Sequence, residues 1–337
     1  MPAAMPLLSH RITHITEAGS DGWEMFYRAK AMIAQGIPVV ELTIGEHDIK
    51  TDPAILDAMH AAARAGHTGY AAIPGIPALR AAVAERAERM TGVPTRPENV
   101  LITPGGQAAL FAAHQLVGDP GDPALYVDPY YATYPGTIRA TGLTPVAVRA
   151  RAEEGFEPGE ADLAAAAAGG ARSLLINSPN NPTGVVYSRR TLEGVARVAA
   201  RHDLWVISDE VYDSQIWEGE FLSPRAMPGM MERTLVVGSM SKSHAMTGSR
   251  LGWVIGPEEA ILALWDLSTV SNYGIPGFIQ DAGVFALSLG PGYEARIAEP
   301  FRRRRAITQR LLAGQSVVRL APQGGGCMRC WTCARQG

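Results

Sequence analysis

The chain lacks the features that mark membrane-spanning, exported or nucleic-acid-binding proteins. No apolar run approaches the ~18–20 residues that a membrane-spanning helix needs. The first fifteen residues contain no apolar segment of the kind found in export signals. The net charge of the 337 residues is only −3, with an isoelectric point near 6.3, so no basic excess is available for nucleic acid. We therefore expect a cytoplasmic protein that binds neither nucleic acid nor a membrane.

Lysine and cysteine are both scarce. Only three of the 30 basic residues are lysines, at positions 30, 50 and 242, so chemistry that requires an amine nucleophile has three candidates. The cysteines all lie in the last eleven residues, namely Cys327, Cys330 and Cys333. This Cys-x2-Cys-x2-Cys pattern is one thiolate short of a zinc or iron–sulfur ligand set, and no other cysteine is present. We expect no metal site.

Short apolar segments alternate with helical patterns along most of the chain. The expected strands are 39–44, 100–103, 124–127, 144–148, 173–177, 204–208, 234–238 and 251–255. The expected helices are 23–36, 53–65, 76–91, 107–117, 191–202 and 258–289. Such alternation is typical of an α/β fold in which helices cover both faces of a mostly parallel sheet. In these sheets ligands bind at the carboxyl ends of the strands.

Two of these strand ends are followed by turn-forming residues. After 100–103 the chain reads Pro-Gly105-Gly106-Gln107 and enters a helix, whose first amides suit a phosphate, although a plain tight turn could use the same residues. After 173–177 it reads Ser-Pro-Asn-Asn-Pro-Thr-Gly, more turn formers than one turn needs, and Asn181 offers an amide there.

Two other strand ends carry charged residues. Asp209 follows an apolar strand, where a carboxylate is costly to bury without a partner. A cationic ligand nitrogen would supply that partner, as would an ordinary salt bridge. Lys242 follows the next strand, flanked by serines in a chain that otherwise uses arginine. Schiff-base chemistry requires an amine, which arginine cannot provide, so Lys242 is the candidate nucleophile.

Two of these stretches are specific in combination: Asn-Ser-Pro-Asn-Asn-Pro-Thr-Gly at 177–184 and Ser-Met-Ser-Lys…Met-Thr-Gly-Ser-Arg-Leu-Gly at 239–252. They resemble the fold-type-I pyridoxal-phosphate (PLP) enzymes, specifically the class I/II aminotransferases of the aspartate-aminotransferase type. The resemblance extends from about residue 44 to about residue 320, with four motifs in the expected order.

The resemblance implies an α/β fold with two domains. A large PLP-binding domain, residues 46–257, would contain a mostly parallel seven-stranded sheet flanked by helices. Residues 1–45 would form an N-terminal arm and part of a small domain. Residues 258–337 would contain a linking helix and an incomplete small α+β domain.

The resemblance also implies roles for individual residues. Lys242 would form a Schiff base with PLP and shuttle the substrate proton, and Asp209 would face the pyridinium nitrogen. Tyr212 and Asn181 would hydrogen-bond the phenolic oxygen, and Tyr131 would stack on the ring. The expected phosphate ligands are Gly105, Gly106, Gln107, Ser239, Ser241 and Arg250.

Two further residues concern the substrate and a second subunit. Gly45 would lie beside the substrate carboxylate, together with Asn181. Tyr70, in Tyr-Ala-Ala-Ile-Pro-Gly-Ile-Pro, matches a tyrosine that reaches the neighbouring subunit's phosphate, which implies a homodimer with composite sites.

The implied function is transfer of an amino group from an amino acid to a 2-oxo acid in a ping-pong cycle through the Lys242 Schiff base. The motifs do not separate this activity from that of a C–S lyase, decarboxylase or synthase on the same scaffold. A third reading is a truncated PLP-binding chain with little activity, because the family's carboxylate-binding arginine lies in a C-terminal segment with no counterpart here.

The C-terminal sequence departs from the family after Gly325. The family continues with residues such as Gly-Met-Tyr, whereas residues 326–337 read Gly-Cys-Met-Arg-Cys-Trp-Thr-Cys-Ala-Arg-Gln-Gly. Permitted codons read in a shifted frame give Met-Tyr-Ala-Met-Leu-Asp-Val-Arg-Ala-Thr-Gly, a strand in the family's style. The single codons of Met328 and Trp331 constrain this reading. We therefore expect residues 326–337 to be out of frame, which resequencing of the locus would test.

Overall fold

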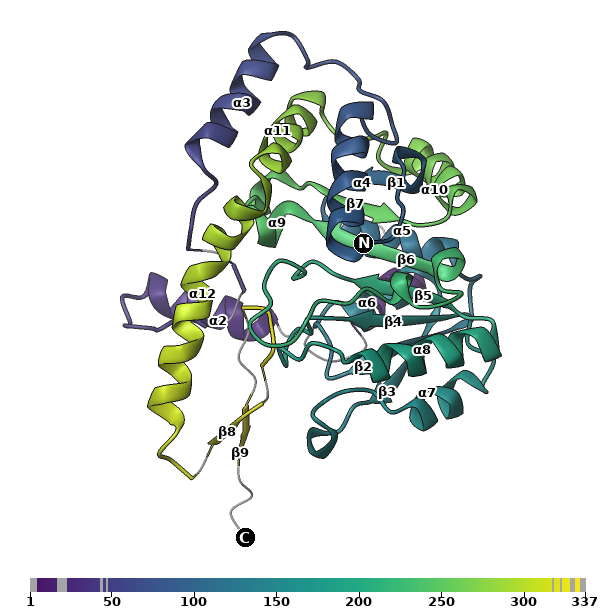
Figure 1. The fold of residues 1–337 in the computed structure, drawn as a ribbon, viewed down its shortest axis with the longest axis vertical. Coiled ribbons are helices and arrows are strands. Elements are labelled where there is room, and N and C mark those ends of the chain that lie inside the picture. The colour runs from purple at the N-terminus through teal and green to yellow at the C-terminus, as the bar shows by residue number, and fades with distance from the viewer. Residues whose placement is uncertain are drawn as a thin grey trace.

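The computed structural model describes residues 5–16, 23–42, 45–46, 48–316, 318–321, 323–327 and 331–333. Its centre is a seven-stranded sheet with the order β1-β7-β6-β5-β4-β2-β3, flanked by helices (Figure 1). The strands are β1 (Val100–Thr103), β2 (Pro123–Asp128), β3 (Thr144–Arg149), β4 (Ser173–Asn177), β5 (Trp205–Asp209), β6 (Thr234–Ser239) and β7 (Gly252–Ile255). β7 pairs antiparallel with β1 and β6, and the other pairings are parallel. The prediction of a mostly parallel seven-stranded sheet is confirmed.

Most α-helices of the described residues flank this sheet (Figure 1). The α-helices are α1 (His10–Thr13), α2 (Trp23–Ala34), α3 (Pro53–Arg64), α4 (Pro77–Thr91), α5 (Gly106–Leu116), α6 (Tyr134–Thr141), α7 (Glu160–Ala167), α8 (Arg189–His202), α9 (Met240–Ser243), α10 (Glu258–Ser271), α11 (Gly277–Ser288) and α12 (Gly290–Leu312). Of these, α2 and α12 lie to one side of the sheet (Figure 1). None of these α-helices is both long and apolar enough to cross a membrane.

Both faces of the central strands are buried, which explains the continuous apolar character of these strands. Every residue of β4 is buried, and successive side chains of a strand point to opposite faces. Leu174 and Ile176 belong to the core formed with α7 and α8, whereas Leu175 belongs to the core formed with α5, α6 and α10. Central strands covered on both faces have no polar side, so short uninterrupted apolar runs identified them in the sequence.

Two sequence-based predictions of secondary structure are wrong. Residues 39–42 form no strand, and residues 43 and 44 lie outside the described residues. The side chains of Val40 and Leu42 are 87% and 81% exposed, so this apolar run does not belong to the core. The expected helix 258–289 is two helices, α10 and α11, because Gly274 adopts a φ of +88° and Pro276 lacks an N–H.

The C-terminal part of the chain runs along α12 to a separate hairpin (Figure 1). There β8 (Val318–Leu320) pairs antiparallel with β9 (Trp331–Cys333), apart from the seven-stranded sheet. All strands of the large sheet lie between residues 100 and 255. The domain boundaries after residues 45 and 257 remain predictions.

The close approach of β7 to the loop before α5 requires a glycine. A Cβ on Gly252 would lie 2.7 Å from the carbonyl carbon of Gly105 and 2.8 Å from the carbonyl oxygen of Gly238. Gly252→Ala must therefore push two backbone segments apart, and we expect it to lower the free energy of unfolding by about 1–3 kcal/mol. Gly248→Ala is the control, because no atom lies within 4 Å of its Cβ position. Equal urea-unfolding free energies for the two variants would contradict this explanation.

Candidate active site

The carboxyl ends of β4, β5 and β6 bring polar residues from distant parts of the sequence to one edge of the sheet. Asn177, the last residue of β4, is paired in register with Asp209, the last residue of β5. Its side-chain amide donates to the Asp209 carbonyl oxygen at 2.8 Å, and its side-chain oxygen accepts from the Asn181 backbone N–H at 2.7 Å. Asn177 thus fixes the turn that carries Asn181 against the end of β5. The sequence analysis did not assign a role to Asn177.

The Asp209 carboxylate is buried and held by two donors. The Tyr134 hydroxyl donates to one carboxylate oxygen at 2.8 Å, and the Val211 backbone N–H donates to the other at 3.3 Å. Burial raises the pKa of Asp209 to about 6, although both hydrogen bonds and the charge of Lys242 act in the opposite direction. This role of Tyr134 was not predicted. The only signal in the sequence was its proximity to Tyr131 in the motif Pro-Tyr-Tyr-Ala-Thr-Tyr.

Lys242 lies in the short helix α9, immediately after β6. Its Nζ donates to the Gly45 carbonyl oxygen at 2.5 Å and lies 5.9 Å from the centroid of the Tyr212 ring. Burial lowers the pKa of Lys242, and the nearby Cys327 and Glu46 oppose this shift. The predicted nucleophile, tyrosine and substrate-side glycine therefore lie together.

Tyr212 is buried beside a residue that the sequence analysis did not place in the site. Burial raises the pKa of its hydroxyl well above the usual range, and the hydroxyl shares a hydrogen bond with the Cys327 thiol. The Cys327 sulfur lies 3.9 Å from the position of a Cβ on Gly45. No group of three or more potential ligands close enough to hold a metal occurs among the described histidines, cysteines and carboxylates.

The predicted phosphate ligands form a cradle at the N-terminus of α5. A Cβ on Gly105, whose φ is +81°, would lie 2.5 Å from a guanidinium nitrogen of Arg250. A Cβ on Gly106 would lie 3.6 Å from the Ser239 Cβ, and the Ser239 hydroxyl donates to the Ser241 hydroxyl at 2.9 Å. Helix N-terminal amides, two hydroxyls and a guanidinium are a suitable donor set for a phosphate.

Gln107 and Tyr131 connect this cradle to α6. The Gln107 side chain donates to the Thr137 hydroxyl at 2.7 Å and accepts from the Thr133 hydroxyl at 3.0 Å. The Tyr131 ring packs edge-on against Tyr134, with centroids 5.7 Å apart. Burial and the negative charge of Asp209 raise the pKa of Tyr131, while Arg250 opposes the shift. Tyr131 therefore lies within electrostatic reach of both the carboxylate and the cradle.

Tyr70 differs from the other predicted site residues because it lies on the surface. Its side chain is 90% exposed and packs edge-on against Tyr273, with centroids 5.0 Å apart. Its predicted phosphate contact involves a second subunit and stays a prediction.

The arrangement fits PLP. Because Gly105 has no side chain, the Arg250 guanidinium can lie against its backbone, and an anion bound there would meet both this cation and the amides at the start of α5. The buried Asp209 carboxylate suits a protonated ring nitrogen, and the Lys242 amine suits an aldehyde.

Comparisons with known proteins agree with this chemistry. The model of the family "Aminotransferase class I and II" matches residues 37–332. The chain is 40% identical over 309 residues to an arginine–pyruvate transaminase of Pseudomonas aeruginosa, covering 91% of this chain and 78% of the relative. It is 38% identical over 301 residues to an aspartate/prephenate aminotransferase of Thermus thermophilus, covering 88% and 77% of the two chains.

The fold comparison gives the same family. The structure of the Thermus thermophilus aspartate aminotransferase with maleate superposes with a TM-score of 0.89 at 35% identity, covering 95% of this chain and 84% of that one. The aspartate aminotransferase of Thermotoga maritima superposes with a TM-score of 0.89 at 32% identity. These matches confirm the predicted family, fold and cofactor. The chain belongs to the class I and II aminotransferases and is a PLP-dependent enzyme that transfers amino groups between amino acids and 2-oxo acids.

Proposed function

We propose that this chain carries out amino-group transfer at the carboxyl edge of the sheet, with Lys242 as the residue that binds PLP covalently. The supporting observation is the environment of the three lysines. Lys30 forms an ion pair with Glu41 at 3.0 Å and Lys50 is exposed, whereas Lys242 lies beside Tyr212 with its pKa lowered by burial. A lowered pKa increases the neutral fraction of the amine, which is the nucleophilic form.

When bound, PLP supplies an electron sink for the carbanion formed at the substrate's α-carbon. The Lys242 Nζ is the group within the site that can remove the α-proton and return it, because its amine is neutral more often than that of an exposed lysine. The nearby carbonyl oxygen of Gly45 orients this amine toward the side of the site assigned to the substrate carboxylate.

The remaining side chains would hold the cofactor in place. Asp209, oriented by the Tyr134 hydroxyl, would pair with the ring nitrogen. Tyr212 and Asn181 would hydrogen-bond the phenolic oxygen, and Tyr131 would stack on the ring. The backbone amides at the start of α5 would bind the phosphate together with the side chains of Ser239, Ser241 and Arg250.

The borohydride reaction tests the assignment of Lys242. We expect the PLP-loaded chain to be trapped covalently by borohydride at one lysine, and Lys242→Ala to abolish both trapping and the visible absorption band. Peptide mapping by mass spectrometry identifies the modified residue. Lys50→Ala is the control, because Lys50 is exposed and should leave trapping unchanged. Trapping that persists in Lys242→Ala would refute the assignment.

Because the Asp209 carboxylate is buried, Asp209→Asn should stabilise the cofactor-free chain but weaken its binding of PLP. Its pKa is about 6 in the folded chain and about 4 when unfolded, so the stability of the cofactor-free protein falls as pH rises from about 4 to about 6. At pH 8 the buried charge costs about 3 kcal/mol. Asp209→Asn removes this cost because an amide carries no charge. The amide oxygen can still accept from the Tyr134 hydroxyl.

We therefore expect cofactor-free Asp209→Asn to be more stable than the native chain at pH 8, by up to about 3 kcal/mol, with the difference vanishing near pH 4. PLP binding should weaken in the same variant. Urea unfolding at several pH values measures the first effect, and exposed Asp266→Asn provides a matched control. A stability difference that is independent of pH would show that the Asp209 charge is not its cause.

We further propose that the chain acts as a homodimer in which Tyr70 contributes to the partner's phosphate cradle. Tyr70, Val270 and Tyr273 have side chains that are 90%, 83% and 53% exposed, and two of them pack on each other. Exposed apolar and aromatic side chains of this kind are enriched at protein interfaces.

Tyr70→Phe tests this composite site. Loss of one hydrogen bond to a charged phosphate should weaken PLP affinity by about 10- to 100-fold while the protein stays dimeric by sedimentation equilibrium. Tyr273→Phe, in the adjacent ring, should leave PLP affinity unchanged. A monomeric native chain, or equal PLP affinities for Tyr70→Phe and the native chain, would refute the proposal.

A further inference from the structure

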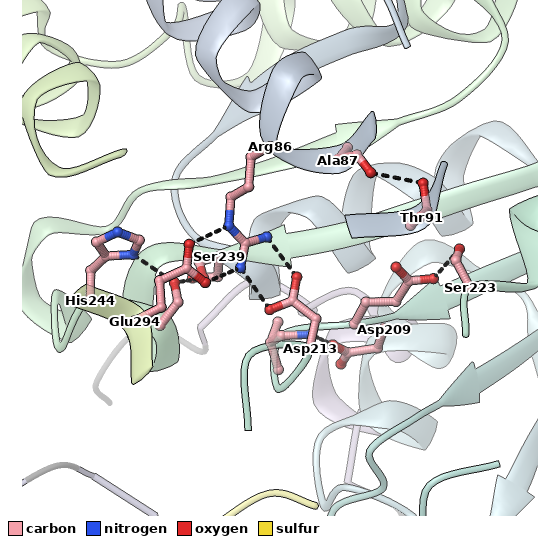
Figure 2. Close-up of polar contacts among 12 residues, drawn as sticks. Arg86, Ala87, Thr91, Asp209, Asp213, Ser223, Ser239, His244 and Glu294 are labelled. Carbon is pink, nitrogen blue, oxygen red and sulfur yellow. Dashed lines mark hydrogen bonds and ion pairs between the residues drawn. The ribbon is translucent and has the colours of Figure 1, made fainter. Parts of the chain in front are cut away.

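A buried ion cluster lies behind the active site and connects three elements. Arg86, in α4, is only 4% exposed. Its two terminal nitrogens donate to the Asp213 carboxylate at 2.7 and 2.9 Å. Its Nε and one terminal nitrogen donate to the Glu294 carboxylate of α12 at 2.9 and 2.6 Å. Figure 2 shows the guanidinium between these two carboxylates.

One end of this cluster is covalently adjacent to the active-site tyrosine. Asp213 directly follows Tyr212, and both belong to one tight turn. The Asp213 N–H donates to the Glu210 carbonyl oxygen at 3.0 Å, and the Gln215 N–H donates to the Tyr212 carbonyl oxygen at 2.9 Å. Fixing the Asp213 carboxylate therefore fixes the backbone from which the Tyr212 ring projects toward Lys242.

The other end of the cluster reaches the segment that follows Lys242. Glu294 is preceded by Tyr293, whose ring stacks on His244 with centroids 5.4 Å apart. His244 lies two residues beyond Lys242, and its Nδ1 is 2.8 Å from the Ser243 hydroxyl. The guanidinium thus connects the turn carrying the tyrosine with the helix that packs against the lysine segment.

The chemistry of the cluster requires an arginine. The planar guanidinium forms two bidentate pairs on different edges, which a single ammonium group cannot do. Removing one partner of a buried ion pair leaves an uncompensated charge, so each carboxylate depends on this side chain for its position.

We propose that Arg86 is a positioning residue that holds the Tyr212 hydroxyl at the cofactor through Asp213. The proposal rests on the proposed contact between Tyr212 and the phenolic oxygen of PLP. A hydrogen bond to that oxygen draws electron density from the ring system and makes the linked lysine nitrogen less basic. Displacement of Tyr212 therefore makes this nitrogen more basic.

The test measures the pKa of the Lys242–PLP linkage by titrating the visible absorption of the loaded protein between about pH 5 and pH 10. We expect Tyr212→Phe to raise this pKa by about 1 unit, the equivalent of one hydrogen bond. Arg86→Lys and Asp213→Asn should raise it in the same direction. Arg86→Lys should add nothing in the Tyr212→Phe background, since both changes remove the same interaction.

Arg225→Lys is the matched control. Arg225 is also 4% exposed, but its guanidinium donates to the Thr95 hydroxyl at 2.6 Å and to the Pro94 carbonyl oxygen at 3.3 Å, and within the described chain it forms no hydrogen bond with residues 211–214. Its substitution should lower Tm without changing the linkage pKa. If Arg86→Lys fails to fold, Asp213→Asn tests the same connection while retaining the pair between Arg86 and Glu294.

The outcomes separate the proposals. If Tyr212→Phe raises the pKa but Arg86→Lys and Asp213→Asn only lower Tm, Arg86 has a purely structural role and the inference is wrong. If Tyr212→Phe leaves the pKa unchanged, the proposed role of Tyr212 is wrong, and the inference fails with it.

Discussion

The burial of a carboxylate at the end of the central strand constrains the whole active site. Asp209 is 5% exposed, and a buried carboxylate is tolerated only where donors or a cation compensate for the lost water. Tyr134 and the Val211 N–H provide part of this compensation, yet the pKa of Asp209 remains raised to about 6. A cationic ring nitrogen would complete it. The same electrostatic deficit that destabilises the cofactor-free chain would then favour PLP binding.

A second set of buried charges begins only four residues along the chain. Asp209 faces the site, whereas Asp213 pairs with Arg86 on the other side of the turn. The turn between them carries Tyr212 and is thus held at both ends by charged groups, not by apolar packing alone. Ion pairs have stricter geometry than apolar contacts. A tyrosine carried between two such anchors has little freedom to move.

The sequence singled out residues that the structure brings together at the sheet edge, but not the connections around them. Strands such as β4 were identifiable because both of their faces are buried, and Asp209 and Lys242 were identifiable because they are charged residues at or just beyond the ends of such strands. The strand predicted at 39–44 was wrong for residues 39–42 because an apolar run does not reveal whether its side chains are exposed. Tyr134, Asn177 and Arg86 act through hydrogen bonds to residues far away in the sequence. Partners that are distant in the sequence leave no pattern of neighbouring residues from which they could be predicted.

The C-terminal segment contacts the site through its backbone on both sides of the frame change that the sequence predicts after Gly325. The Gly325 N–H donates to the Gly184 carbonyl oxygen at 2.9 Å, and the Gly326 N–H donates to the Gln215 carbonyl oxygen at 2.8 Å. A Cβ on Gly325 would lie 2.6 Å from the Gln215 carbonyl oxygen, so glycine is required there. This requirement supports an intact frame through Gly325. Backbone bonds do not depend on side chains, so the Gly326 bond places residue 327 beside Gly45 and Tyr212 whether or not its identity as cysteine reflects the predicted frameshift.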